Sequence, residues 1–133
     1  MEINRSIDIE EAIRATLSDY QTVYCAPLPA NYSLPNILVT ATGGDTMATS
    51  SGKGKVDTFM VVLDARAELE ADAMEYLRTA VAILEAQNGS HGISHVEVNS
   101  LYSWGEDPVR PDLVMCSATL MVTAHRETIT ISN

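Results

Sequence analysis

The most regular hydrophobic pattern in the chain lies between residues 55 and 88. Within residues 56–64, bulky apolar side chains occupy both alternating faces. One face carries Val56, Met60 and Val62, and the other carries Phe59, Val61 and Leu63. This period-two pattern predicts a strand in the middle of a sheet, covered on both sides.

Residues 65–87 predict a long helix directly after this strand. The segment is rich in alanine, and its larger apolar residues recur at spacings of three and four: Met74, Leu77, Val81 and Leu84. Asp64 stands where an N-cap is expected, and Asn88-Gly89 supplies a stop signal. Roughly six turns, at about 1.5 Å per residue, would lay this helix across a small sheet.

The remaining segments complete a predicted α+β fold in a single domain spanning residues 1–133. Ser6 precedes an apolar stripe, so residues 6–20 predict a shorter helix. Runs of β-prone residues predict further strands at 22–26, 34–41, 95–104 and 113–125. Adjacent strands joined by loops predict a mainly antiparallel or mixed sheet, packed by one long and one shorter helix.

The last two predicted strands each have two distinct faces. In residues 95–104, one face carries Val96, Val98, Tyr102 and Trp104. In residues 113–125, the second face carries Met115, Ser117, Thr119, Met121 and Thr123. We interpret the final strand as an edge strand that either adds to a neighbouring subunit's sheet, is covered by it, or faces solvent.

Three polar segments lie outside these elements. Residues 43–55 are rich in glycine, serine and threonine and predict a long flexible hairpin loop. Loops of this length are uncommon in compact domains and are often functional, so a partner surface is a reasonable use. Residues 105–112 form a turn, and residues 126–133 either pair with another subunit or are disordered.

Composition narrows the possible partners. The 133 residues are 46% hydrophobic, which suffices for a core without disulfides or metals. Eighteen acidic and eight basic residues give a net charge of −10, which disfavours ordinary nucleic-acid binding. No signal peptide and no apolar run of the ~20 residues needed to cross a bilayer is present, so we expect no membrane partner and synthesis in a cytoplasm. Cys25 and Cys116 favour reduced thiols over a disulfide.

Candidate catalytic and metal sites are weak. His91 and His95 have zinc-like spacing, but Gly89 and Gly92 interrupt any helix there. Residues 52–55 hint at a phosphate loop, yet they lack its first glycine and its Ser or Thr, and a strand follows. The acidic residues near the start of the long helix complement its dipole. We therefore predict no catalytic residue, no cofactor and no metal.

Tyr102 and Trp104 leave one alternative open. The two rings could stack a ligand, although packing in the core or against a subunit is the commoner use of such a pair.

Several turn and strand patterns recur together along the chain. The first half contains Tyr24, Leu28-Pro29-Ala30-Asn31, Leu34-Pro35-Asn36-Ile37-Leu38-Val39 and Gly43-Gly44, followed by Asp64-Ala65 and the helix alanines Ala67, Ala71, Ala73 and Ala80. The second half contains Trp104, Asp107-Pro108, Arg110-Pro111 and the strand Leu120-Met121-Val122-Thr123-Ala124-His125. Over residues 3–125 the chain thus resembles siphophage tail terminator proteins, of the lambda-type minor tail protein U kind.

The resemblance implies a structural role without an active site. Such proteins form hexameric rings that cap the tail tube, end its polymerisation and join the head-side connector, while DNA passes through the lumen. The implied partners are further copies of the chain, the tail tube protein and the connector or stopper protein, and the implied location is the head-proximal end of the virion tail. No motif of the family assigns contact residues.

Physical arguments supply candidate contact residues instead. The loop at residues 43–55 and the region of the turn at residues 105–112 are predicted to contact the tube or a neighbouring subunit. The candidate contact residues are Asp45, Thr46, Met47, Thr49, Ser50, Lys53, Lys55, Trp104, Glu106, Asp107 and Arg110. Acidic residues on the exposed helix face predict a DNA-repelling lumen at Glu68, Asp72 and Glu75. The alternatives are another neck or tail-tube protein, or a small dimeric enzyme or ligand-binding domain with a pocket around His95, Tyr102 and Trp104.

Overall fold

A computed structural model describes residues 1–48, 55–87 and 89–132 of the chain. In chain order the elements are β1 (Glu2–Arg5), α1 (Ile9–Leu17), β2 (Val23–Cys25), β3 (Asn36–Ala48), β4 (Lys55–Ala67), α2 (Glu70–Glu85), a 3-10 turn (Ser90–Gly92), β5 (Ile93–Glu106), β6 (Val114–His125) and β7 (Glu127–Thr130). Strands β2-β3-β4-β6-β5 form one sheet, and β1 and β7 form a second. The predicted α+β class with a mixed sheet is confirmed, since β2 runs parallel to β3 and the other pairs are antiparallel.

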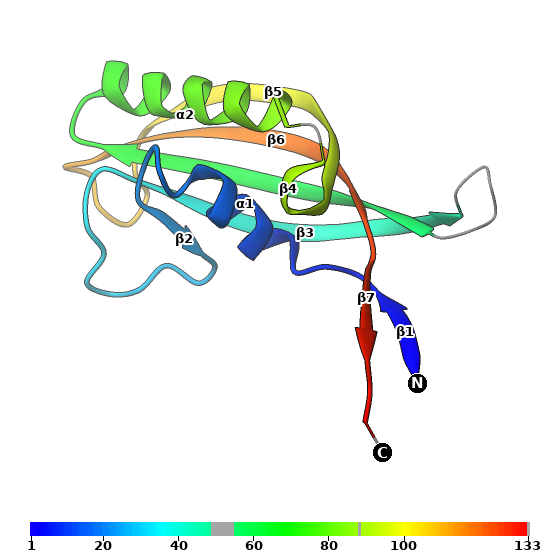
Figure 1. Cartoon of the computed structure of the whole chain (residues 1–133). Coiled ribbons are helices and arrows are strands. Elements are labelled where there is room, and N and C mark those ends of the chain that lie inside the picture. Colours follow the sequence, from blue (N-terminus) through cyan, green and yellow to red (C-terminus); the bar gives the residue numbers. More distant parts are fainter. Residues whose placement is uncertain (49–54, 88, 133) are drawn as a thin grey trace.

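Strand β4 occupies the centre of the large sheet, as its apolar pattern predicts. Both helices pack on the same face of this sheet (Figure 1). Val61 and Leu63 on that face are fully buried, whereas Met60 and Val62 on the other face are partly exposed. The prediction that β4 is covered on both faces is therefore wrong for the chain by itself, because neither helix of the described residues covers the second face.

The two helices begin later than their sequence patterns suggest. Asp64 pairs with Ser117 inside the β4–β6 ladder, so it does not cap α2; Leu69 takes the N-cap position without a side-chain hydrogen bond. Asp8, not Ser6, caps α1, and its Oδ1 accepts a hydrogen bond of 3.1 Å from the Glu11 backbone N–H. Pairing with β6 extends β4 to Ala67, and this ladder overrides the helix propensity of the alanine-rich segment.

One continuous core joins the helices to the large sheet. Apolar stripes of both helices meet inward-facing residues of β3, β4, β5 and β6. The largest fully buried side chains are Ile13, Leu17, Ile37, Leu63, Leu77, Leu84, Ile93, Leu113 and Leu120. The packing of α1 and α2 on one side leaves the opposite face of the sheet as an open surface.

The positions of β5 and β6 differ from the sequence interpretation. Strand β6 lies between β4 and β5, so it cannot add to a neighbour's sheet as an edge strand; β5 is the edge strand on this side of the sheet, and β2 is the edge strand on the other. Register shifts between Val98 and Ser100 and between Ser103 and Gly105 break the simple alternation in β5. Val96 and Val98 therefore face the helices while Tyr102 lies on the open face beside Ser117, and the predicted shared face is wrong.

The predicted loop at residues 43–55 is largely replaced by strand. Gly43 to Ala48 pair with Lys55 to Met60, so the β3–β4 ladder continues through this segment, with β6 beside β4 as far as Val56. The prediction of a long flexible loop is wrong for residues 43–48 and 55, and residues 49–54 lie outside the described part of the chain. Backbone hydrogen bonds of the ladder order this segment without requiring large apolar side chains.

The C-terminal segment pairs within its own chain. Strand β7 is antiparallel to β1, with Ile3 opposite Ile129 and Asn4 opposite Thr128. This two-stranded ribbon stands away from the main body (Figure 1). The prediction of disorder is therefore wrong for residues 127–130, contact with another subunit stays a prediction, and residue 133 lies outside the described range.

Candidate assembly surfaces

The β3–β4 hairpin carries several of the predicted contact residues. Asp45, Thr46 and Met47 belong to β3 and Lys55 to β4. Pairing between β2 and β3 ends at Val39, whereas β6 accompanies β4 as far as Val56, so β3 from Thr40 to Ala48 has one edge without a strand partner in the described chain. The other three predicted residues of this segment lie outside the described residues: Thr49, Ser50 and Lys53.

Asp107 organises the turn between β5 and β6. Its Oδ2 accepts a hydrogen bond of 2.8 Å from Arg66 Nε on β4, and its Oδ1 accepts one of 2.9 Å from the Val109 backbone N–H. Burial raises the pKa of Asp107, but the hydrogen bonds from Val109 and Arg66 outweigh it and hold the pKa below its usual range. Only 3% of Asp107 is exposed, so its carboxylate acts inside the turn and is not displayed to a partner.

The rest of this turn is accessible. Val109 is 86% exposed, and Arg110 and Glu106 are exposed as well. Arg110 Nη2 donates a hydrogen bond of 2.6 Å to Asp112 Oδ2, and this bond lowers the pKa of Asp112. The turn therefore presents an apolar side chain beside a neutralised ion pair.

A pocket of about 310 Å³ lies beside this turn. Its lining combines the proline-containing segment before β3 with β4 and the turn: Leu28, Pro29, Ala30, Tyr32, Arg66, Asp107, Val109 and Arg110. No local sequence pattern indicates that these two segments meet, because their contact depends on the positions of β3 and β6 on either side of β4 in the sheet.

Trp104 lies near the end of the edge strand. Its Nε1 donates a hydrogen bond of 2.8 Å to Ser117 Oγ, which in turn donates to Asp64. The Tyr102 ring meets it edge-on, with ring centroids 5.2 Å apart. Trp104 nevertheless stays 56% exposed, so its ring is held in place by polar contacts and is open to a partner.

His95 is remote from the aromatic pair. It lies opposite Thr123, whereas Tyr102 lies opposite Ser117. Six residues of extended strand separate these positions by roughly 20 Å. The geometry therefore does not assemble a ligand pocket from His95, Tyr102 and Trp104.

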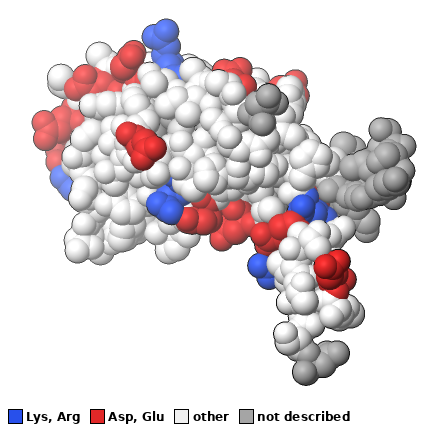
Figure 2. Space-filling view, in the orientation of Figure 1, with Lys and Arg blue, Asp and Glu red and all other residues white. Residues whose placement is uncertain are grey.

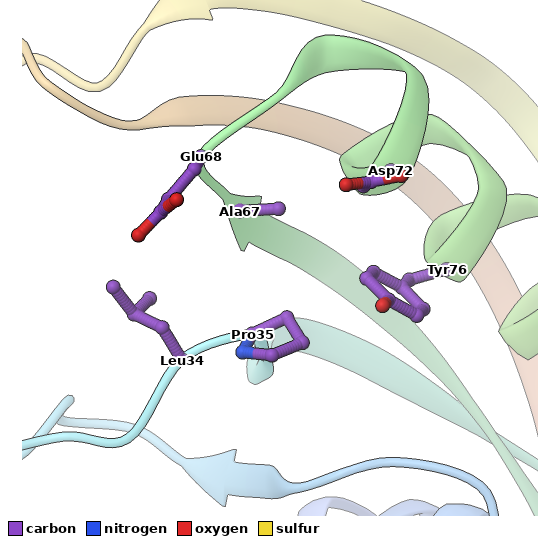
Figure 3. Close-up of a pocket in the computed structure, with 6 residues that line it drawn as sticks. All are labelled: Leu34, Pro35, Ala67, Glu68, Asp72 and Tyr76. Atoms are coloured by element: carbon purple, nitrogen blue, oxygen red, sulfur yellow. The ribbon is translucent and has the colours of Figure 1, made fainter.

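The three predicted lumen residues lie on and just before α2 and are exposed. Glu68 and Asp72 line an open pocket of about 160 Å³ together with Leu34, Pro35, Ala67 and Tyr76 (Figure 3). Glu75 accepts a hydrogen bond of 3.5 Å from Thr79 Oγ1. Figure 2 shows acidic residues gathered at the end of the molecule where α2 begins.

Metal-binding geometry and membrane-spanning helices are not found in the described ranges. No group of three or more His, Cys, Asp or Glu side chains there is arranged to hold a metal ion. No helix among these residues is long and apolar enough to cross a membrane. Cys25 and Cys116 are both free, and burial raises the pKa of each thiol.

Comparison with known proteins gives a likeness of fold. No protein family matches the sequence, and no curated protein matches it either. Among solved structures, the chain is similar to a chain of the "Virion of native gene transfer agent (GTA) particle". The two share 12% sequence identity with a TM-score of 0.51, and the match covers 85% of this chain and 84% of the other.

Proposed function

We propose that this chain is a structural virion protein that caps a phage tail tube as a homohexameric ring. In this role it ends tail polymerisation and presents the surface that joins the head-side connector, at the head-proximal end of the tail. The observation that carries the proposal is the fold shared with a virion chain of the gene transfer agent particle along most of both chains. The sequence resemblance to tail terminators adds the specific role.

The shape of the chain supports contacts with more than one neighbour. A ring places a different surface of the chain against each of two adjacent copies. The chain offers an unpaired edge of β3, a projecting ribbon and the edge strand β5 with exposed apolar residues. A tail cap needs further surfaces for the tube protein and the connector, and the turn around Val109 and Arg110 is a candidate for one of these.

The acidic helix surface fits a DNA-conducting lumen. Glu68, Asp72 and Glu75 would repel the phosphate backbone, so DNA would pass without specific binding. In this arrangement the protein needs no cofactor and performs no catalysis.

Mass measurement combined with a capping assay tests the function. Light scattering over a concentration series is run on the protein alone and with purified tail tubes. We expect either a closed hexamer, or a monomer that binds tube ends and stops their growth. A stable dimer that leaves tube growth unchanged would contradict the proposal and favour a small ligand-binding domain.

A second candidate in the same setting is a tail-tube or neck protein. Such a protein would polymerise into open-ended stacks instead of stopping after one ring. Electron microscopy of the concentrated protein distinguishes these outcomes, because a terminator should yield single rings at most.

A further inference from the structure

The β1–β7 ribbon has one apolar face and one polar face. Strand alternation places Ile3 and Ile129 on the same face, and Met1 and Ile131 continue it toward the tip, while the Arg5–Glu127 ion pair ends the apolar part of this face at the base of the ribbon. The opposite face carries Asn4 and Thr128, joined by a hydrogen bond of 2.7 Å, together with Glu2 and Thr130. Met1 and Ile131 are both exposed, so the apolar face is uncovered at its outer end.

The base of the ribbon is fixed to the body by one buried carboxylate. Ser6 Oγ donates a hydrogen bond of 2.7 Å to Asp57 Oδ2, and Arg126 Nε donates one of 3.2 Å to the same atom. Asp57 lies on the central strand and is only 4% exposed. Both strands of the ribbon are thus tied at their point of exit, which holds the ribbon at a defined angle.

An isolated two-stranded ribbon is marginally stable in water and needs a further partner. Within the described residues β1 and β7 have no other strand partner, and Figure 1 shows them pointing away from both helices. A surface that covers the isoleucine face would supply the missing burial.

The chain itself presents a matching surface elsewhere. Val98 and Leu101 are exposed on the helix-side face of β5, opposite Leu120 and Ala118 of β6, and the outer edge of β5 is unpaired in the described chain. With Met1 and Ile131 they make up four of the seven large apolar side chains that the described residues expose, the others being Leu69, Trp104 and Val109. The ribbon leaves the body at His125, near the start of β5, and extends away from the sheet, so it reaches this strip only in another molecule.

Charge also favours a second copy as the partner. Residues 1–6 and 126–133 contain two acidic and two basic residues, namely Glu2, Glu127, Arg5 and Arg126. The whole net charge of −10 therefore falls on residues 7–125. Two acidic bodies repel each other, whereas an electrically neutral ribbon can cross the gap between them without this penalty.

We propose that the β1–β7 ribbon is an assembly arm whose isoleucine face packs on the exposed apolar strip of β5 in a second copy of this chain. The arm and the strip are different surfaces, so the contact is heterologous and propagates from copy to copy until rotation closes a ring. The inference rests on the proposed ring, for which it names the contact between neighbouring subunits.

The first test compares two ribbon variants. Ile129→Asp places a charge on the apolar face, and Thr130→Asp places the same charge on the polar face one residue away. Sedimentation should show that I129D weakens self-association at least about tenfold, the loss expected from one buried isoleucine, while T130D assembles like the wild type. Both should keep the thermal unfolding of the wild type, because the ribbon lies outside the core. Equal assembly of I129D and the wild type would overturn the proposal, as would a wild type that stays monomeric at every concentration.

The second test identifies the receiving surface. A chain carrying both Ile131→Cys and Leu101→Cys should form a ladder of disulfide-linked multimers on mild oxidation. Each single variant serves as the control for Cys25 and Cys116 and should give no ladder. Absence of the ladder in the double variant under conditions where the wild type assembles would overturn the assignment of β5.

A tube-capping assay distinguishes a failure of the arm–β5 contact from a failure of the proposed capping function. If the wild type is monomeric yet caps tubes, the function stands and the arm–β5 contact fails. If I129D assembles normally but no longer caps tubes, the ribbon belongs to the tube interface, and the second-copy proposal is again overturned. If the wild type forms rings through the ribbon but ignores tubes, the capping function fails and the arm stands.

Discussion

Asp107 is the single residue on which the turn between β5 and β6 depends. Its carboxylate joins Arg66 on β4 to the backbone of Val109, and the side chains of both partners in the ion pair are nearly buried. Removing one partner of such a pair leaves an uncompensated charge inside the protein and lowers its stability strongly. Replacing both partners by apolar residues would change the stability much less.

We predict that Asp107→Asn lowers the free energy of unfolding at neutral pH by about 3 kcal/mol. Urea unfolding of D107N and the wild type measures this difference. Asp112→Asn is the matched control, because its ion pair with Arg110 is exposed and screened, so stability should stay close to that of the wild type. A D107N variant as stable as the wild type would show that the buried pair does not hold the turn.

The same substitution has a defined pH dependence. The pKa of Asp107 is lower in the folded state than the ~3.9 of an unfolded chain. Its stabilising contribution is therefore fully present above about pH 4 and is lost as pH falls through the folded pKa. The stability difference between the wild type and D107N should be constant from pH 5 to 7 and shrink below about pH 4.

At the scale of elements, the two helices start in contrasting ways. Helix α1 begins with a side-chain cap from Asp8, whereas Leu69 at the start of α2 has the extended backbone of an N-cap, makes no capping hydrogen bond and is 63% exposed. An apolar residue at this position leaves backbone N–H groups of the first turn to solvent.

We predict that Leu69→Ser stabilises the isolated protein by about 1 kcal/mol, because a serine hydroxyl can accept from the first turn of α2. Asp8→Ala removes the equivalent cap from α1 and should destabilise the protein by about 1 kcal/mol. Thermal unfolding of both variants checks the opposite signs. No gain in L69S would mean that the exposed start of α2 does not limit stability.

If L69S is more stable but assembles poorly, Leu69 lies in an interface of the assembled state. The exposed leucine would then be retained for contact with a partner at the cost of helix stability.

At the scale of the whole molecule, charge is distributed unevenly. The body carries the full −10, and exposed acidic residues gather where α2 begins. In an assembled ring, each copy would add the same acidic surface, so the negative charge around DNA in the lumen would increase with the number of copies.

We predict that reversing Glu68, Asp72 and Glu75 together to lysine creates salt-sensitive DNA binding that the wild type lacks. Fluorescence anisotropy with a DNA duplex over a salt series measures this. The control variant reverses three exposed acidic residues away from α2, the ribbon and β5, namely Glu11, Asp19 and Asp112, and should bind DNA less strongly in the assembled state. Equal DNA binding by both variants would argue against α2 as the lumen surface.

Several features were predictable from the sequence because they depend on local patterns. The apolar alternation of residues 56–64 identified the central strand, and the spacing of Leu77, Val81 and Leu84 identified the buried face of α2. The spacing and size of the apolar side chains can be read from consecutive residues, so these features can be predicted without knowing which distant segments they contact. The same holds for the charge that disfavours nucleic-acid binding.

Element ends and surface roles were decided by tertiary structure. The ladder with β6 kept Asp64 and Ala65 in a strand, and bulges in β5 moved Tyr102 to the open face. The burial of Asp107 against Arg66 and the anchoring of the ribbon at Asp57 each join residues more than forty positions apart. Local periodicity was enough to identify the central strand and the buried face of α2, because period and bulk lie in consecutive residues. The strands β1 and β7, the strand at residues 43–48 and the ends of the elements depend on pairing with other strands, which the tertiary structure provides.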